Sequence, residues 1–194
     1  MAGRGHHIDL LTYSDGEDVV IPGCTIHRIR RIPFVRRIRP GFSATKLLSD
    51  AIMLVHAGRL ARRYRYHVVH AVEESVFIAL ALKWVYGIPY VYDMDSSLPT
   101  QLTDQLPALR PLMPLFRRLE RLTVRRSVAV LTMCGALEEL AREQAKPGAL
   151  VGRVEDMAMT DGEVGVDRLA DHTGGGPTVL YVGNLMAYQG VDLL

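Results

Sequence analysis

The 194-residue sequence predicts an α/β protein with a doubly wound, Rossmann-like parallel sheet, and two observations indicate this fold class. Segments typical of strands alternate along the chain with amphipathic segments typical of helices. Several strand segments are continuous apolar runs, the pattern expected of parallel strands that are covered on both faces. The sequence therefore predicts parallel strands joined by crossover helices.

Six segments have the composition of strands, and the first follows Gly5, a residue type that commonly ends helices. They are residues 8–13, 25–30, 67–71, 89–92, 128–132 and 178–182. Residues 178–194 read as a strand, a glycine turn and the opening of a helix, whereas a βαβ unit takes about 30 residues. We therefore expect the chain to be truncated at both ends, an internal piece of a two-domain protein whose first strand is missing.

Apolar residues at helical spacing predict amphipathic helices between the strands. Ser43 can cap a helix that runs to about Tyr64, and Gly87 closes another helix at Tyr86. The apolar stripes are Leu47, Ala51, Leu54 and Val55; then Leu112, Leu115, Phe116, Leu119 and Leu122; then Leu137, Leu140 and Ala141.

Residues 156–177 interrupt the alternation of strands and helices. This region is polar and acidic and contains three successive glycines, Gly174 to Gly176, a composition typical of a linker. We predict a first Rossmann-like domain over residues 1–155, a linker over residues 156–176, and the start of a second domain at residues 177–194.

Composition limits the class of protein. The chain is 48% hydrophobic and 23% charged, as ordinary globular proteins are, and no apolar run approaches the roughly 18 residues of a membrane-spanning helix. The first residues lack the apolar core of a secretory signal. Cys24 and Cys134 are far apart and have no metal-ligand spacing, which favours reduced thiols in the cytoplasm.

Positive charge is concentrated in two clusters, although the net charge is only +2. Six arginines lie within residues 28–39 and five within residues 117–126, with apolar residues between them. Either both clusters are solvated faces, or they form a surface that meets anionic lipid headgroups or a phosphorylated acceptor. Nucleic acid is less favoured as a partner, because no nucleic-acid-binding motif accompanies the arginines.

Ligands of open α/β sheets bind beyond the carboxyl ends of the strands, so polar residues at those ends are the candidate site. They are His70, Glu73, Glu74 and Ser75; Asp93, Asp95, Ser96, Ser97 and Gln101; Cys134; and Gly183 and Asn184. Each has an ordinary structural alternative, since a histidine can end a strand, acids favour the helix dipole and serines cap turns. Gathered at one rim of a sheet, they favour a functional site.

The segment from Asp93 to Ser97 allows a second interpretation. A strand that ends in Asp-x-Asp resembles the nucleophile loop of haloacid-dehalogenase-type phosphatases, in which one aspartate attacks phosphorus, the other is acid and base, and Mg²⁺ is bound. That loop normally follows the first strand of its domain, and its usual Gly-Thr is Ser96-Ser97 here.

Five segments form a recognisable series when they are taken in order. They are GHHIDLLT at residues 5–12; HVVHA at 67–71; IPYVYD at 88–93; LER at 119–121 with SVAVLTMC at 127–134; and YVGNL at 181–185 with YQGVDLL at 188–194. In order and spacing they resemble the family 4 glycosyltransferases of the GT-B fold, and the series covers nearly the whole chain.

The resemblance implies a role for each part of the chain. The first domain would cradle the acceptor, the second would bind a nucleotide-sugar co-substrate, and transfer would need no metal and no other cofactor. Asp93 and Asp95 stand in the "HD" loop of the family, where an acid can act as general base. His70, Glu73, Glu74 and Ser96 would lie on the acceptor side.

The donor side departs from the family pattern. Gly183, Asn184, Gln189 and Gly190 would bind the donor, but the family commonly has Arg and Lys where Asn184 and Gln189 stand. Both amides can hydrogen-bond a phosphate without offsetting its charge, so basic residues elsewhere would be needed.

Three functions therefore compete. The leading one is a retaining transferase for cell-envelope or exopolysaccharide glycans, acting on a glycan or lipid-linked acceptor and inactive as this piece alone. We expect it to be cytoplasmic, with peripheral contact at the inner face of an anionic membrane. The alternatives are a Mg²⁺-dependent phosphatase that uses Asp93 and Asp95, and a non-catalytic α/β binding module.

Overall fold

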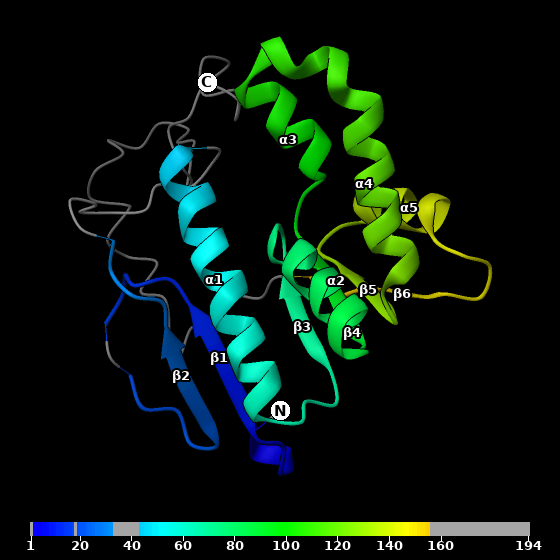
Figure 1. The fold of residues 1–194 in the computed structure, drawn as a ribbon. Coiled ribbons are helices and arrows are strands. Elements are labelled where there is room, and N and C mark those ends of the chain that lie inside the picture. Colours follow the sequence, from blue (N-terminus) through cyan, green and yellow to red (C-terminus); the bar gives the residue numbers. More distant parts are fainter. Residues whose placement is uncertain (1, 18, 33–42, 156–194) are drawn as a thin grey trace, which may run out of the picture. The chain divides into compact units, whose positions relative to one another are not determined.

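Strands and helices alternate along the part of the chain that the computed structural model describes, residues 2–17, 19–32 and 43–155 (Figure 1). These residues all belong to the unit Met1–Glu155. The strands are β1 (Ile8–Thr12), β2 (Cys24–Arg28), β3 (Val69–Val72), β4 (Tyr90–Met94), β5 (Ala129–Thr132) and β6 (Leu150–Arg153). The helices are α1 (Ala44–Arg63), α2 (Ser75–Tyr86), α3 (Leu98–Gln105), α4 (Met113–Arg126) and α5 (Gly135–Gln144), with short 3₁₀ helices η1 (Ala2–Arg4) and η2 (Pro107–Leu112).

The strands pair in parallel and form two groups. β1 pairs with β2, and the other four form a sheet in the order β3-β4-β5-β6. α1 connects the two groups along the chain and packs against both α2 and β1. The predicted α/β class with Rossmann-like parallel strands is confirmed.

Five of the six predicted strands correspond to β1 through β5, with ends that differ by at most two residues. The sixth, residues 178–182, lies outside the described residues, as does the predicted linker. No strand was predicted at β6, which is only four residues long and contains Gly152. Glycine weakens strand propensity, so β6 is defined mainly by its pairing with β5.

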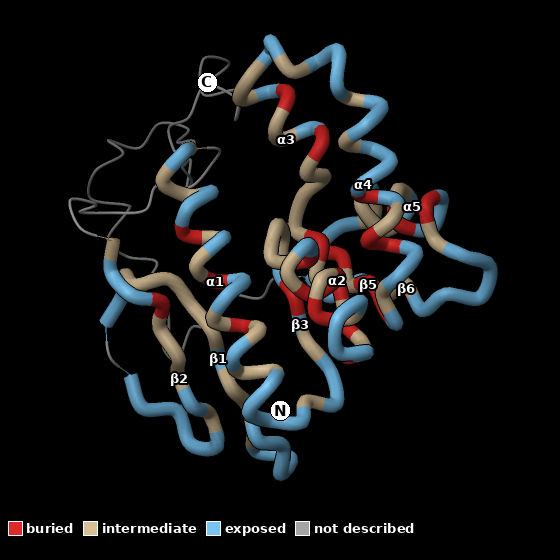
Figure 2. The backbone as a smooth tube through the Cα atoms, viewed as in Figure 1, coloured by how far each residue is buried: buried red, intermediate tan, exposed pale blue. Residues whose placement is uncertain are grey.

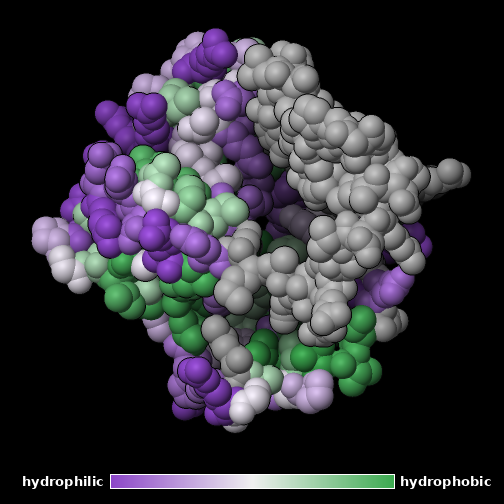
Figure 3. Space-filling model, turned by 180° about the vertical axis from the view of Figure 1, so that it is seen from behind, coloured by the Kyte–Doolittle hydropathy of each residue, from purple (hydrophilic) through white to green (hydrophobic). Residues whose placement is uncertain are grey.

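The core lies on one face of the four-stranded sheet. Tyr90, Tyr92 and Met94 of β4 are fully buried and pack with side chains of α2, α4 and α5, such as Val76 and Ala141. In Figure 2, buried backbone positions gather around α2, β3 and β5. Successive strand residues alternate between faces, so the intervening residues of β4 point the other way, and they are only partly buried. Figure 3, which views the molecule from behind, shows hydrophobic residues (green) on the surface beside hydrophilic ones (purple).

The helix ends follow the predicted capping chemistry. The Ser43 hydroxyl accepts a hydrogen bond of 3.1 Å from the backbone N–H of Lys46, and α1 runs from Ala44 to Arg63 as predicted. Gly87 ends α2 with a left-handed φ of 71°. Within the described residues, no helix combines the length and the hydrophobicity that a membrane crossing requires.

Most of the apolar stripes predicted for α1 and α4 are not buried, although an amphipathic pattern implies that they should be, and only Leu122 of α4 packs against the core. Leu47 and Leu54 of α1 are 51% and 41% exposed, and Leu115 and Leu119 of α4 are 49% and 39% exposed. The buried faces carry Ser49, Met53 and Ala57 in α1 and Glu120, Thr123 and Val124 in α4. Leu137 and Leu140 of α5 do pack against the core, as predicted.

Polar contacts explain why the inner face of α4 is not apolar. The Glu120 carboxylate accepts hydrogen bonds from Ser97 at 3.1 Å and from Gln144 at 2.7 Å, and the Tyr90 hydroxyl donates to the Thr123 carbonyl at 2.7 Å. Part of each stripe instead lines a groove of about 440 Å³, together with residues of α2 and α3; the stripe residues in its lining are Leu47, Ala51 and Leu54 of α1 and Phe116 and Leu119 of α4. We call it the α1–α4 groove.

We predict opposite effects for two glycine-to-alanine substitutions. Gly87→Ala should lower the free energy of unfolding by about 1 kcal/mol, because its φ of 71° is strained for any residue with a Cβ. Gly58→Ala, inside α1, should raise it by up to about 1 kcal/mol, since its Cβ would lie 3.8 Å from the Tyr86 hydroxyl, an ordinary contact. Urea unfolding of both variants measures the effects. Changes of the same sign would contradict the left-handed cap at Gly87 or the helical position of Gly58.

Candidate functional site

Glu73 turns the chain from β3 into α2 with a left-handed backbone. Its φ is 47°, and it is the one non-glycine residue with positive φ within residues 2–17, 19–32 and 43–155. The Glu73 N–H donates to the Asp93 carbonyl at 3.0 Å, and the Val76 N–H donates to the Glu73 carbonyl at 3.1 Å. A glutamate in this conformation stores roughly 1–3 kcal/mol of strain, which suggests that its side chain is kept for a functional reason.

His70 and Asp93 meet across β3 and β4. The register pairs Val72 with Asp93 and His70 with Val91, so all four side chains lie on the same face of the sheet. His70 Nε2 is 2.8 Å from Asp93 Oδ2, and the two side chains are 36% and 30% exposed. An ionised carboxylate only accepts hydrogen bonds, so Nε2 donates, and the other carboxylate oxygen can receive a ligand.

Glu73 is surrounded by other acids and by Ser96. Partial burial raises the pKa of Glu73, and the carboxylates of Glu74 and Asp95 raise it further. The Ser96 hydroxyl donates to Glu73 Oε1 at 3.4 Å. The candidate residues at the ends of β3 and β4 therefore form one acidic rim.

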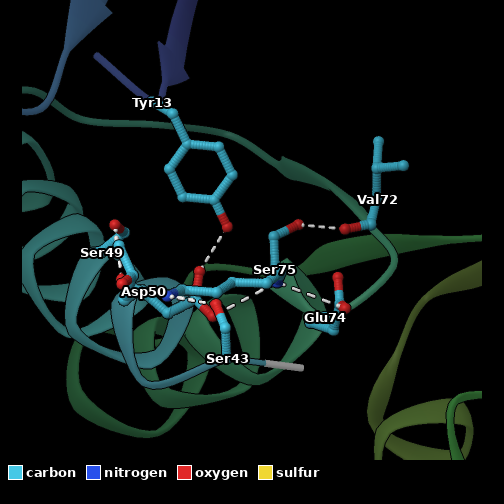
Figure 4. Close-up of polar contacts among 9 residues, drawn as sticks. Tyr13, Ser43, Ser49, Asp50, Val72, Glu74 and Ser75 are labelled. Carbon is cyan, nitrogen blue, oxygen red and sulfur yellow. Dashed lines mark hydrogen bonds and ion pairs between the residues drawn. The ribbon is translucent and has the colours of Figure 1, made fainter. Parts of the chain in front are cut away.

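A second polar cluster joins Tyr13, directly after β1, to the first two turns of α1 and to Glu74, the N-cap residue of α2 (Figure 4). The Tyr13 hydroxyl donates to the Asp50 carboxylate, and Lys46 Nζ lies 3.4 Å from Asp50 Oδ2 and 3.3 Å from Glu74 Oε1. Partial burial and the bond to Asp50 raise the pKa of Tyr13 to about 12. Partial burial alone would lower the pKa of Lys46, but the charge of Glu74, followed by Tyr13 and Asp50, raises it.

The structure thus brings together most of the predicted acceptor-side residues. His70 pairs with Asp93 and Ser96 with Glu73, and a backbone hydrogen bond joins Glu73 to Asp93. Glu74 instead joins the second cluster through Lys46. Ser97, also considered as a site residue, instead donates to the buried Glu120. Gly183, Asn184, Gln189 and Gly190 lie outside the described residues.

Sequence reasoning missed Tyr13, Lys46 and Asp50. Tyr13 directly follows β1, so the rule that selects strand ends could have found it. Lys46 and Asp50 are four residues apart in α1, a spacing that predicts a neighbouring pair on one helix face but not a position at a site. Within the described part of the chain, no group of three or more His, Cys, Asp or Glu is arranged to hold a metal ion.

Comparisons with known proteins identify relatives of this fold. The model of the family described as glycosyl transferase 4-like domain matches residues 1–151. The structure is similar to that of sucrose-phosphate synthase from Thermosynechococcus elongatus, with a TM-score of 0.60 and 15% sequence identity. The match covers 81% of this chain and 40% of the synthase chain. No curated protein matches the sequence significantly.

We predict that Glu73→Gln stabilises the protein more at neutral than at acidic pH. The raised pKa of Glu73 means that folding disfavours its ionised form, so this group destabilises the fold as pH rises above its unfolded value of about 4.5. Glutamine removes this pH-dependent penalty while keeping the shape of the side chain. Urea unfolding at pH 4 and pH 7 tests the prediction, with Glu143→Gln on the exposed surface of α5 as control. A difference from wild type that is equal at both pH values would contradict it.

Proposed function

The chain belongs to the glycosyl transferase 4-like domain family, and on that basis we propose that it forms the acceptor-binding part of a glycosyltransferase. The enzyme would move a sugar from a nucleotide-sugar donor to a hydroxyl group of a glycan or lipid-linked acceptor, with retention of configuration. The observation that carries this proposal is the exposed His70–Asp93 pair beside the strained Glu73, at the carboxyl ends of adjacent parallel strands.

The proposed chemistry assigns the acceptor to this rim. The acceptor hydroxyl hydrogen-bonds the free oxygen of Asp93, and Asp93 takes its proton as the acceptor oxygen bonds to the sugar C1. The bond from C1 to the nucleotide diphosphate breaks, and the diphosphate leaves with the electron pair. His70 holds Asp93 in place through the 2.8 Å hydrogen bond. Asp95 and Glu73 orient the other acceptor hydroxyls.

The donor is proposed to bind beyond the first domain. Residues 1–155 would form the acceptor domain, residues 156–176 a linker, and residues 177–194 the start of the nucleotide-sugar domain. Gly183, Asn184, Gln189 and Gly190 would contact the donor phosphates. A helix dipole and basic side chains, rather than a metal ion, would offset the charge of the leaving diphosphate.

Contact with an anionic membrane from the cytoplasmic side is part of the proposal. Arg110, Arg117, Arg118 and Arg121 line a basic pocket of about 480 Å³. No described carboxylate forms an ion pair with any of the four. Leu112 and Leu115 are exposed on the same segment. Basic and apolar residues side by side on a helix suit the surface of an anionic bilayer.

We predict that Asp93→Asn, in a chain that also carries the donor domain, lowers kcat by about 10²- to 10⁴-fold, the usual contribution of a general base. Asp104→Asn, on the exposed face of α3, is the matched control and should leave kcat unchanged. Sugar transfer with a radiolabelled donor measures both, and equal kcat values for the two variants would refute the role of Asp93. A phosphatase built on Asp93 and Asp95 would instead show Mg²⁺-dependent hydrolysis of p-nitrophenyl phosphate.

The membrane surface has a separate test. Replacing Arg117, Arg118 and Arg121 by glutamine should weaken binding to phosphatidylserine vesicles at least about tenfold, since each basic residue near the surface contributes about 1 kcal/mol. Replacing Arg59, Arg62 and Arg63 of α1 removes the same charge from another exposed face and should have a smaller effect. Vesicle co-sedimentation measures both, and equal losses would show that only net charge matters.

A further inference from the structure

The α1–α4 groove exposes apolar side chains that the proposed chemistry does not use. Leu47 and Leu54 of α1, Phe77 of α2 and Leu119 of α4 line it and are 39–51% exposed. Leu98 and Leu102 of α3 and Phe116 of α4 complete its walls. A concave apolar surface of about 440 Å³ is within the size range of small-molecule sites. Its walls suit an alkyl chain.

The lining of the groove includes part of the candidate site. Lys46, Asp50 and Glu74 line it, and they belong to the polar cluster shown in Figure 4. Glu74 directly follows Glu73, whose side chain lies on the acidic rim. A ligand with its apolar part in the groove can therefore place its polar end at this cluster, next to the rim.

The charges of Lys46, Asp50 and Glu74 determine which kind of polar group a ligand can place beside them. Lys46 is already paired with Asp50 and Glu74, so the three side chains together carry one net negative charge. Tyr13 adds none, because its pKa of about 12 keeps it neutral. A phosphate or carboxylate would be repelled here, whereas hydroxyl groups can donate to the carboxylate oxygens.

We propose that the α1–α4 groove binds the alkyl chain of an amphiphilic acceptor whose polar end is an uncharged, hydroxyl-bearing group such as a sugar. The inference rests on the proposed function, because it treats the rim as the place where an acceptor hydroxyl reacts. It narrows the acceptor class to neutral glycolipids and related alkyl glycosides.

Direct binding to the chain tests the proposal without any transfer reaction. Calorimetric titration with octyl β-glucoside, below its micelle concentration, should give a Kd at least about tenfold lower than titration with glucose, because several methylene groups are buried. Octyl phosphate should bind at least about tenfold more weakly than octyl β-glucoside, owing to the negative end of the groove. Equal affinity for glucose and octyl β-glucoside would overturn the groove assignment, and tighter binding of octyl phosphate would overturn the neutral polar end.

A bulky side chain in the groove gives the matched comparison. Ala51 is exposed and lines the groove, so Ala51→Trp should fill it and raise the Kd for octyl β-glucoside at least about fivefold. Leu48→Trp, on an exposed position of α1 outside the groove, should change the Kd less than about twofold. Leu54→Asp, also exposed, is a second blocking variant, and thermal unfolding confirms that each variant is folded. Equal Kd values for the blocking and control variants would refute the proposal.

Failure of this inference is distinguishable from failure of the proposed function. Transfer to free sugars without binding of octyl β-glucoside would refute only the groove. Binding of octyl β-glucoside that Ala51→Trp weakens, in a chain that also carries the donor domain and transfers no sugar, would refute only the transferase.

Discussion

The parallel register between β3 and β4 is the constraint on which the described structure depends. Pairing Val72 with Asp93 places His70 beside Asp93 on one face and leaves Tyr90 and Tyr92 on the other, where they form the core. The same alignment carries the Glu73 N–H to the Asp93 carbonyl and so holds the left-handed turn. A shift of one residue would send the tyrosines to the surface and Asp93 into the core. Core packing and the candidate site are therefore set by one alignment.

The buried carboxylate of Glu120 has a comparable role for the helices. It receives hydrogen bonds from Ser97, at the start of α3, and from Gln144, at the end of α5, and thus ties three helices together. A buried carboxyl group is tolerated only where it is hydrogen-bonded, so α4 turns this face inward. Phe116 and Leu119 of α4 are then left on the groove side. The apolar wall that α4 gives to the groove is thus a consequence of the hydrogen bonds that hold Glu120 in the core.

Local signals in the sequence predicted much of the fold. Ser43 and Gly87 mark helix ends through chemistry that involves only neighbouring residues, and the structure has both caps. The orientation of α1 and α4 could not be read from apolar spacing, because it depends on contacts between residues far apart in the chain, such as Ser97 with Glu120. β6 could not be predicted for the same reason, since its pairing with β5 outweighs the weak strand propensity of its residues.

The candidate site was predictable to the extent that it follows the topology. His70, Glu73 and Asp93 stand at strand ends, and a parallel sheet brings such residues to one edge. Lys46 and Asp50 come from a helix surface, and only the packing of α1 against α2 places them beside Glu74. No periodicity in the sequence encodes that contact.

The charges at the rim indicate which of the two proposed substrates, acceptor or donor, would bind there. Glu73, Glu74, Asp93 and Asp95 lie near one another, with Lys46 as a basic partner of Glu74. A diphosphate would be repelled by this many carboxylates, so we infer that the donor phosphates bind to groups beyond this rim. A neutral hydroxyl is not repelled, and a carboxylate beside it can take the proton that transfer releases. The raised pKa of Glu73 favours proton uptake at the rim in the same way. The carboxylates of the rim thus suit a neutral acceptor hydroxyl, whose proton they can accept, and would repel the diphosphate of a nucleotide-sugar donor.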